Sequence, residues 1–343
     1  TMRWFGWFLV LMLWMQEAEA VLNYQTYQTP VAPLWWIEAR QPEMITLALR
    51  FQAGEAQVPA AQAGLANYAR QLVGESGAGP YTGPELEHEV NNIGLQWRLS
   101  VGYLETVLHL KVLPEFLPRA LALMDLVLTQ PRFDEAADGR VKARLLADYQ
   151  QDQENPEAVA GQVFDGAFYG DHLYGRRQAG TPETIKTFTP ALAAAWWREN
   201  LTQVNLHLFG VGAAAGEDMA KTMAKALANL PRGKTANPER PAVVAAVAPR
   251  RVVQAMNTPQ AVVILAQRAP EFGGPDHYPR QLLNYIVGGG DFGSRLMAEL
   301  RVKRGLTYGV TSQFDYILNG ALWSVDVLTS APAEAIKLIR EQV

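Results

Sequence analysis

The chain has 343 residues, of which 49% are hydrophobic and 19% charged, with a formal net charge of -4 and a pI near 5.8. This length and apolar content suffice for two globular domains with sizeable cores. The acidic balance and the lack of any long basic run argue against nucleic acid as a partner, and the absence of cysteine excludes disulfides, thiolate nucleophiles and cysteine-ligated metals.

The N-terminal segment has the order of a secretory signal peptide. Arg3 precedes an apolar run from Trp4 to Met15, and small residues follow in Ala18-Glu19-Ala20. We therefore predict a signal peptide over residues 1–20, with cleavage after Ala20 and export of the mature chain. A membrane anchor is the disfavoured alternative, because about 12 apolar residues are too few to cross a bilayer. No stable membrane anchor is expected after cleavage.

Beyond this leader, the apolar residues follow first the period of a strand and then that of helices. Ile45, Leu47, Leu49 and Phe51 stand at every second position, as in a half-buried strand. Further strand character is expected at 97–113 and 204–211, and helices are expected from Gly64 onward and at 116–128, 135–151 and 191–198. This order predicts an α+β domain over residues 21–230.

A stretch rich in Pro, Ala and Arg indicates a linker at residues 231–251. After it the first pattern returns, with an apolar strand at 261–267, a loop, and a helical segment. In that segment Leu283-Asn284-Tyr285 echoes Ala66-Asn67-Tyr68, which stands 217 residues earlier. We predict a second, related domain over residues 252–343, and we expect it to be truncated because it is short and stops inside a helical pattern.

Three common kinds of site find little support. Gly288, Gly290 and Gly293 match G-x-G-x-x-G, but the segment before them reads as helical, whereas a dinucleotide site needs a strand there. No G-x-S-x-G elbow indicates a serine hydrolase. No two histidines stand three or four residues apart, so the sequence contains no short motif with the spacing of zinc ligands. The five histidines are His88, His109, His172, His207 and His277.

The segment RLMAELRVKRGLTYGV, residues 295–310, carries a more specific candidate. A helix is expected to end at Gly305 and a strand to begin at Leu306, so Arg301 in the last helical turn and Tyr308 in the strand can share one surface. A guanidinium grips a peptide carbonyl or carboxylate, and a phenol can donate to a developing oxyanion. From these residues alone, a helix C-cap at Gly305 with a solvated Arg301 is the favoured alternative.

Two longer motifs resemble those of the insulinase/pitrilysin family of zinc metallopeptidases, the inverzincins. GGGDFGSRLMAELRVKRGLTYGV is similar to the signature of the family's C-terminal domain. DHLYGRRQAGTPETIKTFTPALAAAWWRENLTQVNLHLFGVG, residues 171–212, is similar to the end of its first domain. The resemblance covers residues 31–343 in the right order. It implies two related insulinase-like (LuxS/MPP-like) domains, each a sheet covered by helices.

The family's catalytic motif is H-x-x-E-H, in which both histidines bind zinc and the glutamate is the general base, with a third ligand, Glu, further on. The resemblance places Asn67 and Gln71 at the histidines, Arg70 at the base and Asp148 at the third ligand. Amides are poor zinc ligands, and a permanent guanidinium neither accepts a proton nor tolerates a nearby divalent ion. We expect no cofactor in this chain and, instead, Arg70 paired with Asp148 or with the amides in a filled cavity.

Some members of the family divide one peptidase between two chains. The resemblance therefore implies that this chain is the zinc-free subunit of an exported, by family habit periplasmic, heterodimeric metallopeptidase. Arg301 and Tyr308 would act in trans on a peptide substrate in the site of a zinc-binding H-x-x-E-H partner, and the chain alone would not hydrolyse peptides. Two alternatives stay open: a non-catalytic scaffold or peptide-binding protein of the same fold, and an autonomous enzyme that uses another site.

Overall fold

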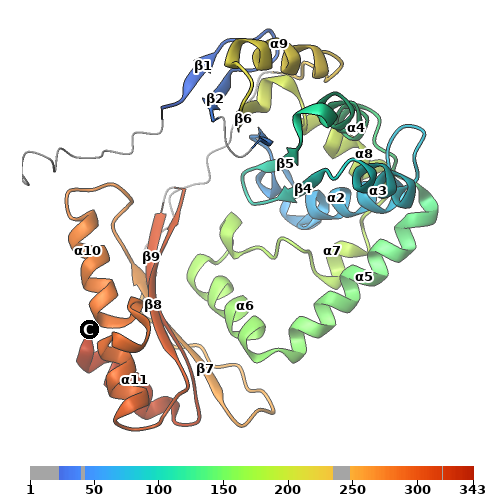
Figure 1. The fold of residues 1–343 in the computed structure, drawn as a ribbon. Helices are drawn as coiled ribbons and strands as arrows, with labels where there is room; N and C mark the ends of the chain where they lie inside the picture. Colours follow the sequence, from blue (N-terminus) through green and yellow to red (C-terminus); the bar gives the residue numbers. More distant parts are fainter. Residues whose placement is uncertain (1–22, 40–42, 235–247, 319) are drawn as a thin grey trace, which may run out of the picture.

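The computed structural model describes residues 23–39, 43–234, 248–318 and 320–343 (Figure 1). The predicted signal peptide, residues 1–20, lies outside these ranges, as does the part of the predicted linker from 235 to 247. The described residues form two separate sheets with their own helices, so the α+β expectation is confirmed. No helix in the described ranges is long and apolar enough to cross a bilayer.

The first sheet has six strands in the order β1-β2-β6-β3-β5-β4. In β3, the alternation seen in the sequence becomes a buried and a half-buried face, because successive side chains of a strand point to opposite sides. The strand character at 97–113 is a hairpin, which turns where the Gly102 amide donates to the Glu105 carbonyl at 2.8 Å. The strands are β1 Gln25–Tyr27, β2 Leu34–Glu38, β3 Ile45–Phe51, β4 Gln96–Val101, β5 Thr106–Val112 and β6 Leu206–Gly212.

Eight helices of the first domain lie within the described ranges. They are α2 Leu65–Ser76, α3 Gly83–Asn92, α4 Leu117–Thr129, α5 Glu135–Glu154, α6 Pro156–Tyr169, α7 Pro182–Ile185, α8 Pro190–Asn200 and α9 Gly216–Ala226. The long α5 runs away from the sheet, and the chain turns back through α6 toward the second domain (Figure 1). There α6 contacts the second sheet, and the Tyr174 hydroxyl donates to the Leu318 carbonyl at 3.2 Å.

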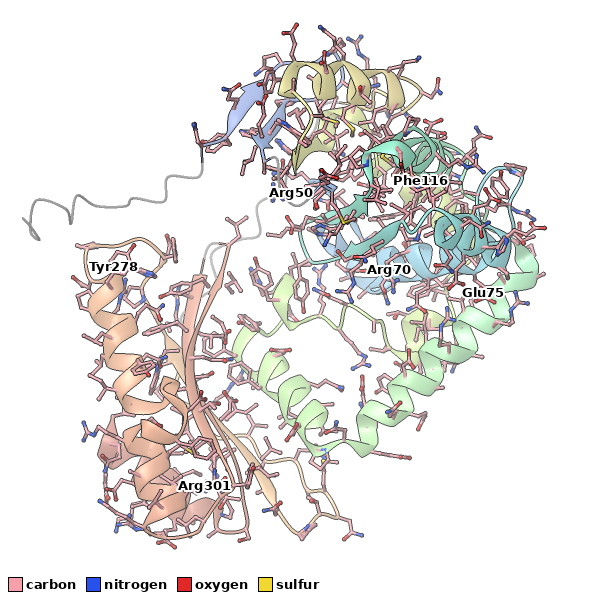
Figure 2. The ribbon with its side chains drawn as sticks, in the orientation of Figure 1. Arg50, Arg70, Glu75, Phe116, Tyr278 and Arg301 are labelled. Atoms are coloured by element: carbon pink, nitrogen blue, oxygen red, sulfur yellow. The ribbon has the colours of Figure 1, made fainter. Side chains whose placement is uncertain are left out.

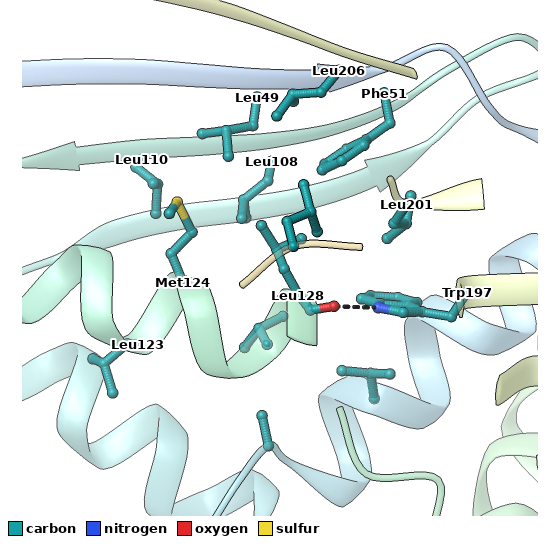
Figure 3. Close-up of a cluster of buried hydrophobic side chains, with 14 of the residues drawn as sticks. Leu49, Phe51, Leu108, Leu110, Leu123, Met124, Leu128, Trp197, Leu201 and Leu206 are labelled. Carbon is teal, nitrogen blue, oxygen red and sulfur yellow. Dashed lines mark hydrogen bonds between the residues drawn. The ribbon is translucent and has the colours of Figure 1, made fainter. Parts of the chain in front are cut away.

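The core of the first domain lies between the sheet and its helices (Figure 3). Leucines of β3 and β5 meet the apolar face of α4, and the indole of Trp197 on α8 closes the end of this layer. Its Nε1 donates to the Leu128 carbonyl at 3.3 Å, so the last turn of α4 gains a partner that its own helix cannot supply. Buried members of this cluster include Leu49, Phe51, Leu108, Leu110, Leu123, Met124, Leu128, Trp197, Leu201 and Leu206.

The second sheet has three antiparallel strands in the order β7-β9-β8. Two α-helices, α10 and α11, lie on one side of it, and α6 of the first domain lies on the other (Figure 1). Its elements are β7 Ala261–Arg268, α10 His277–Asn284, β8 Val310–Ile317, β9 Gly320–Thr329 and α11 Pro332–Gln342. Between α10 and β8 come two π-helical turns, Tyr285–Gly289 and Met297–Val302, and a short 3-10 turn, Asp291–Gly293.

The second domain repeats part of the first. In the first sheet, β3 precedes helix α2 and pairs with β5, which also pairs with β4. In the second sheet, β7 precedes helix α10 and pairs with β9, which also pairs with β8. At the repeat offset Asn67 of α2 corresponds to Asn284 of α10. The Asn284 Oδ1 accepts from Ser312 Oγ and from Trp323 Nε1, each at 2.7 Å, so in the second copy this asparagine fixes the helix to the sheet.

Gly64 determines how closely α2 approaches the chain that covers its first turn. It has a φ of 98°, in the left-handed region that favours glycine. A Cβ at this position would lie 2.5 Å from the Gly180 backbone nitrogen, a separation that neither backbone can relieve without moving. The N-terminus of α2 is therefore placed by a glycine-to-glycine contact.

We expect the substitution Gly64→Ala to lower the free energy of unfolding by at least about 2 kcal/mol, because it combines left-handed backbone strain with a backbone clash. Gly74→Ala in the same helix is the matched control. A Cβ there meets no atom within 4 Å, so it should stabilise the protein by about 0.5 to 1 kcal/mol. Urea unfolding followed by circular dichroism measures both, and similar values for the two variants would contradict the role given to Gly64.

Candidate functional site

The α2 helix presents two different faces. Leu65, Tyr68 and Leu72 point into the core, and Tyr68 is fully buried. Asn67, Arg70 and Gln71 lie on the opposite, half-buried face, as their spacing of three and four residues requires. The three positions that the family resemblance assigns to the zinc motif therefore share one surface.

Arg70 is held by an amide. Its Nε and Nη2 donate to the Asn67 Oδ1 at 3.3 and 3.0 Å. Among the described residues, Arg70 forms no ion pair, and burial together with the nearby guanidiniums of Arg144 and Arg98 lowers its pKa. Of the two pairings expected for Arg70, the structure therefore shows the one with an amide and not the one with Asp148.

The second helix of the site is α5, which supplies Arg144 and Asp148. Arg144 Nε donates to Gln71 Oε1 at 3.1 Å, and its Nη1 lies 3.5 Å from Glu75 Oε2. Around these side chains lies an open hollow of about 440 Å³, so the filled cavity expected from the sequence is wrong. Its lining consists of Arg70, Gln71, Gly74, Glu75, Arg144 and Asp148.

This donor set does not fit zinc. Two amides, a guanidinium and one carboxylate stand where the metal would need imidazoles and carboxylates, and the Arg70 guanidinium repels a divalent cation. Within the ranges that the structure describes, no group of three or more His, Cys, Asp or Glu side chains is placed to hold a metal ion. No step of a reaction can be routed through a metal at this position.

A buried carboxylate at the N-terminus of α2 was not found by sequence reasoning. Glu55 accepts the backbone amide of Gly64 on Oε2 at 3.0 Å and that of Asn67 on Oε1 at 3.3 Å. It therefore satisfies amides that the first turn of the helix leaves free. Burial raises the pKa of Glu55 to about 7, against the opposing effect of these hydrogen bonds. A lone Glu at the start of a short 3-10 turn, Glu55–Gln57, gives no sequence signal for such a role.

The second domain brings Arg301 and Tyr308 together. The Arg301 Cζ lies 4.6 Å from the ring centroid of Tyr308 and 4.6 Å from that of Phe292, so the guanidinium is sandwiched between two rings, a favourable cation–π arrangement. Both rings are largely exposed, at 82% for Tyr308 and 66% for Phe292. The Arg301 Nη1 is buried without a hydrogen-bond partner among the described residues. The C-cap at Gly305 is confirmed, with a φ of 65° and its amide donating to the Arg301 carbonyl at 2.9 Å, whereas the Arg301 side chain is half-buried and not simply solvated.

The turn after Gly305 positions Tyr308. Thr307 Oγ1 donates to the Leu328 carbonyl at 2.7 Å and accepts the Gly309 amide at 3.0 Å, which anchors the turn to β9. The Thr307 hydroxyl takes the Gly309 amide, which strand pairing would otherwise use. The strand β8 therefore begins at Val310 and not at Leu306. Tyr308 lies in the turn before the strand, which corrects the placement expected from sequence.

Phe292 is a site residue that the sequence reasoning missed. It belongs to the run GGGDFG, in which Gly288 serves packing, because a Cβ there would lie 2.6 Å from Ser312 Oγ. The segment before the run is helical, which agrees with the rejection of a dinucleotide site. The signal for Phe292 was an isolated aromatic residue in a glycine-rich turn, without an apolar period to bury it.

The two sets of candidate residues lie on different domains. Figure 2 shows Arg70 and Glu75 on the first domain, where α2 faces α5, and Arg301 on the second domain at the end of its helices. Among the described residues, no hydrogen bond, ion pair or cation–π contact joins the two sets.

Two family models match adjoining parts of the chain. Residues 37–181 match the model described as Insulinase (Peptidase family M16), and residues 187–343 match the model described as Peptidase M16 inactive domain. Together these two matches cover both sets of candidate residues, the whole second sheet and the first sheet except β1 and most of β2.

Solved structures and a curated relative agree with these matches. The chain is similar to the crystal structure of a peptidase M16 inactive domain from Pseudomonas fluorescens, with 28% identity, a TM-score of 0.83 and coverage of 94% of this chain and 78% of that one. The periplasmic protease PqqL from Escherichia coli shares the fold, with 15% identity, a TM-score of 0.77 and coverage of 93% and 36%. An uncharacterized zinc protease of Rickettsia bellii is 23% identical over 277 residues, which are 76% of this chain and 65% of that relative. The chain thus spans less than two thirds of that relative's length.

Glu55 gives a prediction for the dependence of stability on pH. With a folded pKa near 7 and an ordinary value of 4.5, it binds a proton in the folded state over a range where the unfolded chain does not. The free energy of unfolding should therefore fall as pH rises from about 4.5 to about 7. Asp165, whose pKa burial raises to about 6, acts in the same direction.

Urea midpoints measured between about pH 5 and about pH 8 test this slope. Glu55→Gln cannot ionise and should give a flatter dependence, at the cost of a lower overall stability because an amide satisfies fewer backbone donors. Glu115→Gln, at an exposed position, should keep the parent slope. Parallel slopes for the parent and Glu55→Gln would show that Glu55 is not the responsible group.

Proposed function

Because this chain belongs to the insulinase family, peptidase family M16, and lacks its zinc motif, we propose that it is the zinc-free subunit of a heterodimeric metallopeptidase. The observation that carries this proposal is the paired Arg301 and Tyr308. The pair stands on the surface of the second domain, with an unsatisfied guanidinium nitrogen and an exposed phenol. These groups are available to a substrate that reaches this surface.

The chemistry of the pair suits a peptide undergoing hydrolysis. The accessible part of the half-buried Arg301 guanidinium can donate to a backbone carbonyl of the substrate and orient it. The Tyr308 hydroxyl can donate to the carbonyl oxygen that becomes negative in the tetrahedral intermediate, which stabilises the transition state more than the ground state. The partner's H-x-x-E-H site would hold the zinc that activates the attacking water.

The stacking of Arg301 between two rings supports a positioning role. A free arginine samples many rotamers, and ordering it on binding costs conformational entropy. Phe292 and Tyr308 hold the guanidinium plane before any substrate arrives, so less of that cost falls on the binding step. The Arg301 guanidinium is therefore preorganised for ligand binding.

Other parts of the proposal concern the substrate and the compartment. A peptide enclosed between the two subunits can add as an edge strand, and β4 is a free edge of the first sheet in the described structure.

Residues 1–20 have signal-peptide order, and the periplasmic protease PqqL shares the fold. These two observations support export, with the periplasm as the proposed compartment.

The test is a titration of the mature chain into a purified H-x-x-E-H subunit from the same source, with cleavage of a fluorogenic peptide as the readout. We expect saturable activation near equal stoichiometry. Arg301→Ala and Tyr308→Phe should each lower kcat of the complex by about 10- to 1000-fold, because each removes a donor to the reacting carbonyl. Tyr308→Phe keeps the ring stacked on Arg301 and removes only the hydroxyl.

Arg304→Ala is the matched control, because Arg304 lies one turn away and pairs with Glu299 instead. It should leave kcat unchanged. The affinity of the two subunits, measured by biolayer interferometry, should be the same for all four proteins. Tight binding without activation, or activation that survives both substitutions, would replace the proposal with that of a non-catalytic scaffold.

A further inference from the structure

The hollow at the altered zinc motif holds an arginine with unused donors. The Asn67 Oδ1 takes the Nε and Nη2 edge of the Arg70 guanidinium. The Nη1 and the remaining Nη2 hydrogen make no bond to the described residues, which leaves free the end of the guanidinium that forms a fork with a carboxylate. Since Arg70 is half-buried, it is costly to leave such a cation without an anionic partner.

The charges around Arg70 are unbalanced in favour of cations. Arg144 lines the hollow, and Arg98 and Arg144 both act electrostatically on Arg70. The Glu75 carboxylate offsets little of this charge, because Arg140 and Arg144 both pair with it. Asp148 remains as a carboxylate on the lining and forms no ion pair in the described chain.

We propose that this hollow binds a carboxylate of a peptide, held end-on by Arg70. Arg70, which stands where the family motif has its general base, would here act as the anion-binding residue. The cavity of about 440 Å³ is open to the surface and can admit an acidic side chain or a peptide C-terminus. The inference goes beyond the proposed function, because it requires neither the partner subunit nor Arg301.

Isothermal titration calorimetry on the full chain, without any partner, tests the site with three pentapeptide probes, of which the first two are blocked at both ends and the third only at its N-terminus. The first is polyalanine with a central glutamate, the second replaces this glutamate with glutamine, and the third is polyalanine with a free C-terminal carboxylate. We expect the glutamate probe, the free-carboxylate probe or both to bind at least about tenfold more tightly than the glutamine probe. Which of them does so identifies the source of the carboxylate.

Variants of the hollow assign the effect to Arg70. Arg70→Met keeps an apolar stem and should abolish the preference for a carboxylate, and Arg70→Lys keeps the charge without the fork and should retain part of it. Arg198→Met, at an exposed position of α8, should bind as the parent does. Asp148→Asn removes a repelling charge and should strengthen binding.

Two results would overturn the inference. One is equal affinity of the parent for all three probes, and the other is a carboxylate preference that survives in Arg70→Met. Circular dichroism of each variant shows whether it is folded. If Arg70→Met does not fold, Arg70→Lys tests the inference instead, and an undiminished carboxylate preference in that variant would overturn it. Loss of peptidase activation by Arg301→Ala would bear only on the proposed function, because this binding assay contains no partner subunit.

Discussion

The permanent charge of Arg70 is the constraint from which the chemistry of this chain follows. A guanidinium keeps its proton at any physiological pH, so the position that would hold a general base can only donate hydrogen bonds. It binds the neighbouring amide of Asn67, and its field excludes the divalent ion that the rest of the motif would need. Peptide chemistry, if this chain takes part in it, must then depend on residues elsewhere, and Arg301 with Tyr308 are the pair so placed.

The two domains offer two incomplete sites of opposite kinds. The first domain has a hollow whose lining does not fit a metal and in which Arg70 has no ion-pair partner among the described residues, and the second has a guanidinium held against two exposed aromatic residues. Both sites contain an arginine that can donate to the oxygen atoms of a peptide, and this common feature agrees with the proposed role of a subunit that binds substrate for another subunit.

Much of the fold could be predicted because it follows from apolar periodicity. The alternation from Ile45 to Phe51 and the helical period after Gly64 are local signals, and the structure confirms both. The turn expected at Gly305 likewise brought Arg301 and Tyr308 to one surface. What could not be predicted depends on contacts between distant segments: Glu55 on the first turn of α2, Phe292 on Arg301, and Thr307 on β9, which delays the start of β8. Such contacts leave no period in the sequence.

The asparagines at corresponding positions of the two domains bear on how reversible the change at the zinc motif is. Asn284 is tied into the sheet of the second domain by Ser312 and Trp323, whereas Asn67 is the sole recorded hydrogen-bond partner of the Arg70 side chain in the described structure. Returning histidine to position 67 alone would strand the guanidinium, and returning glutamate to position 70 alone would leave a base with no metal to serve. Each of these single replacements breaks the hydrogen bonds between Asn67 and Arg70, so the two positions depend on one another and their substitutions should not have additive effects.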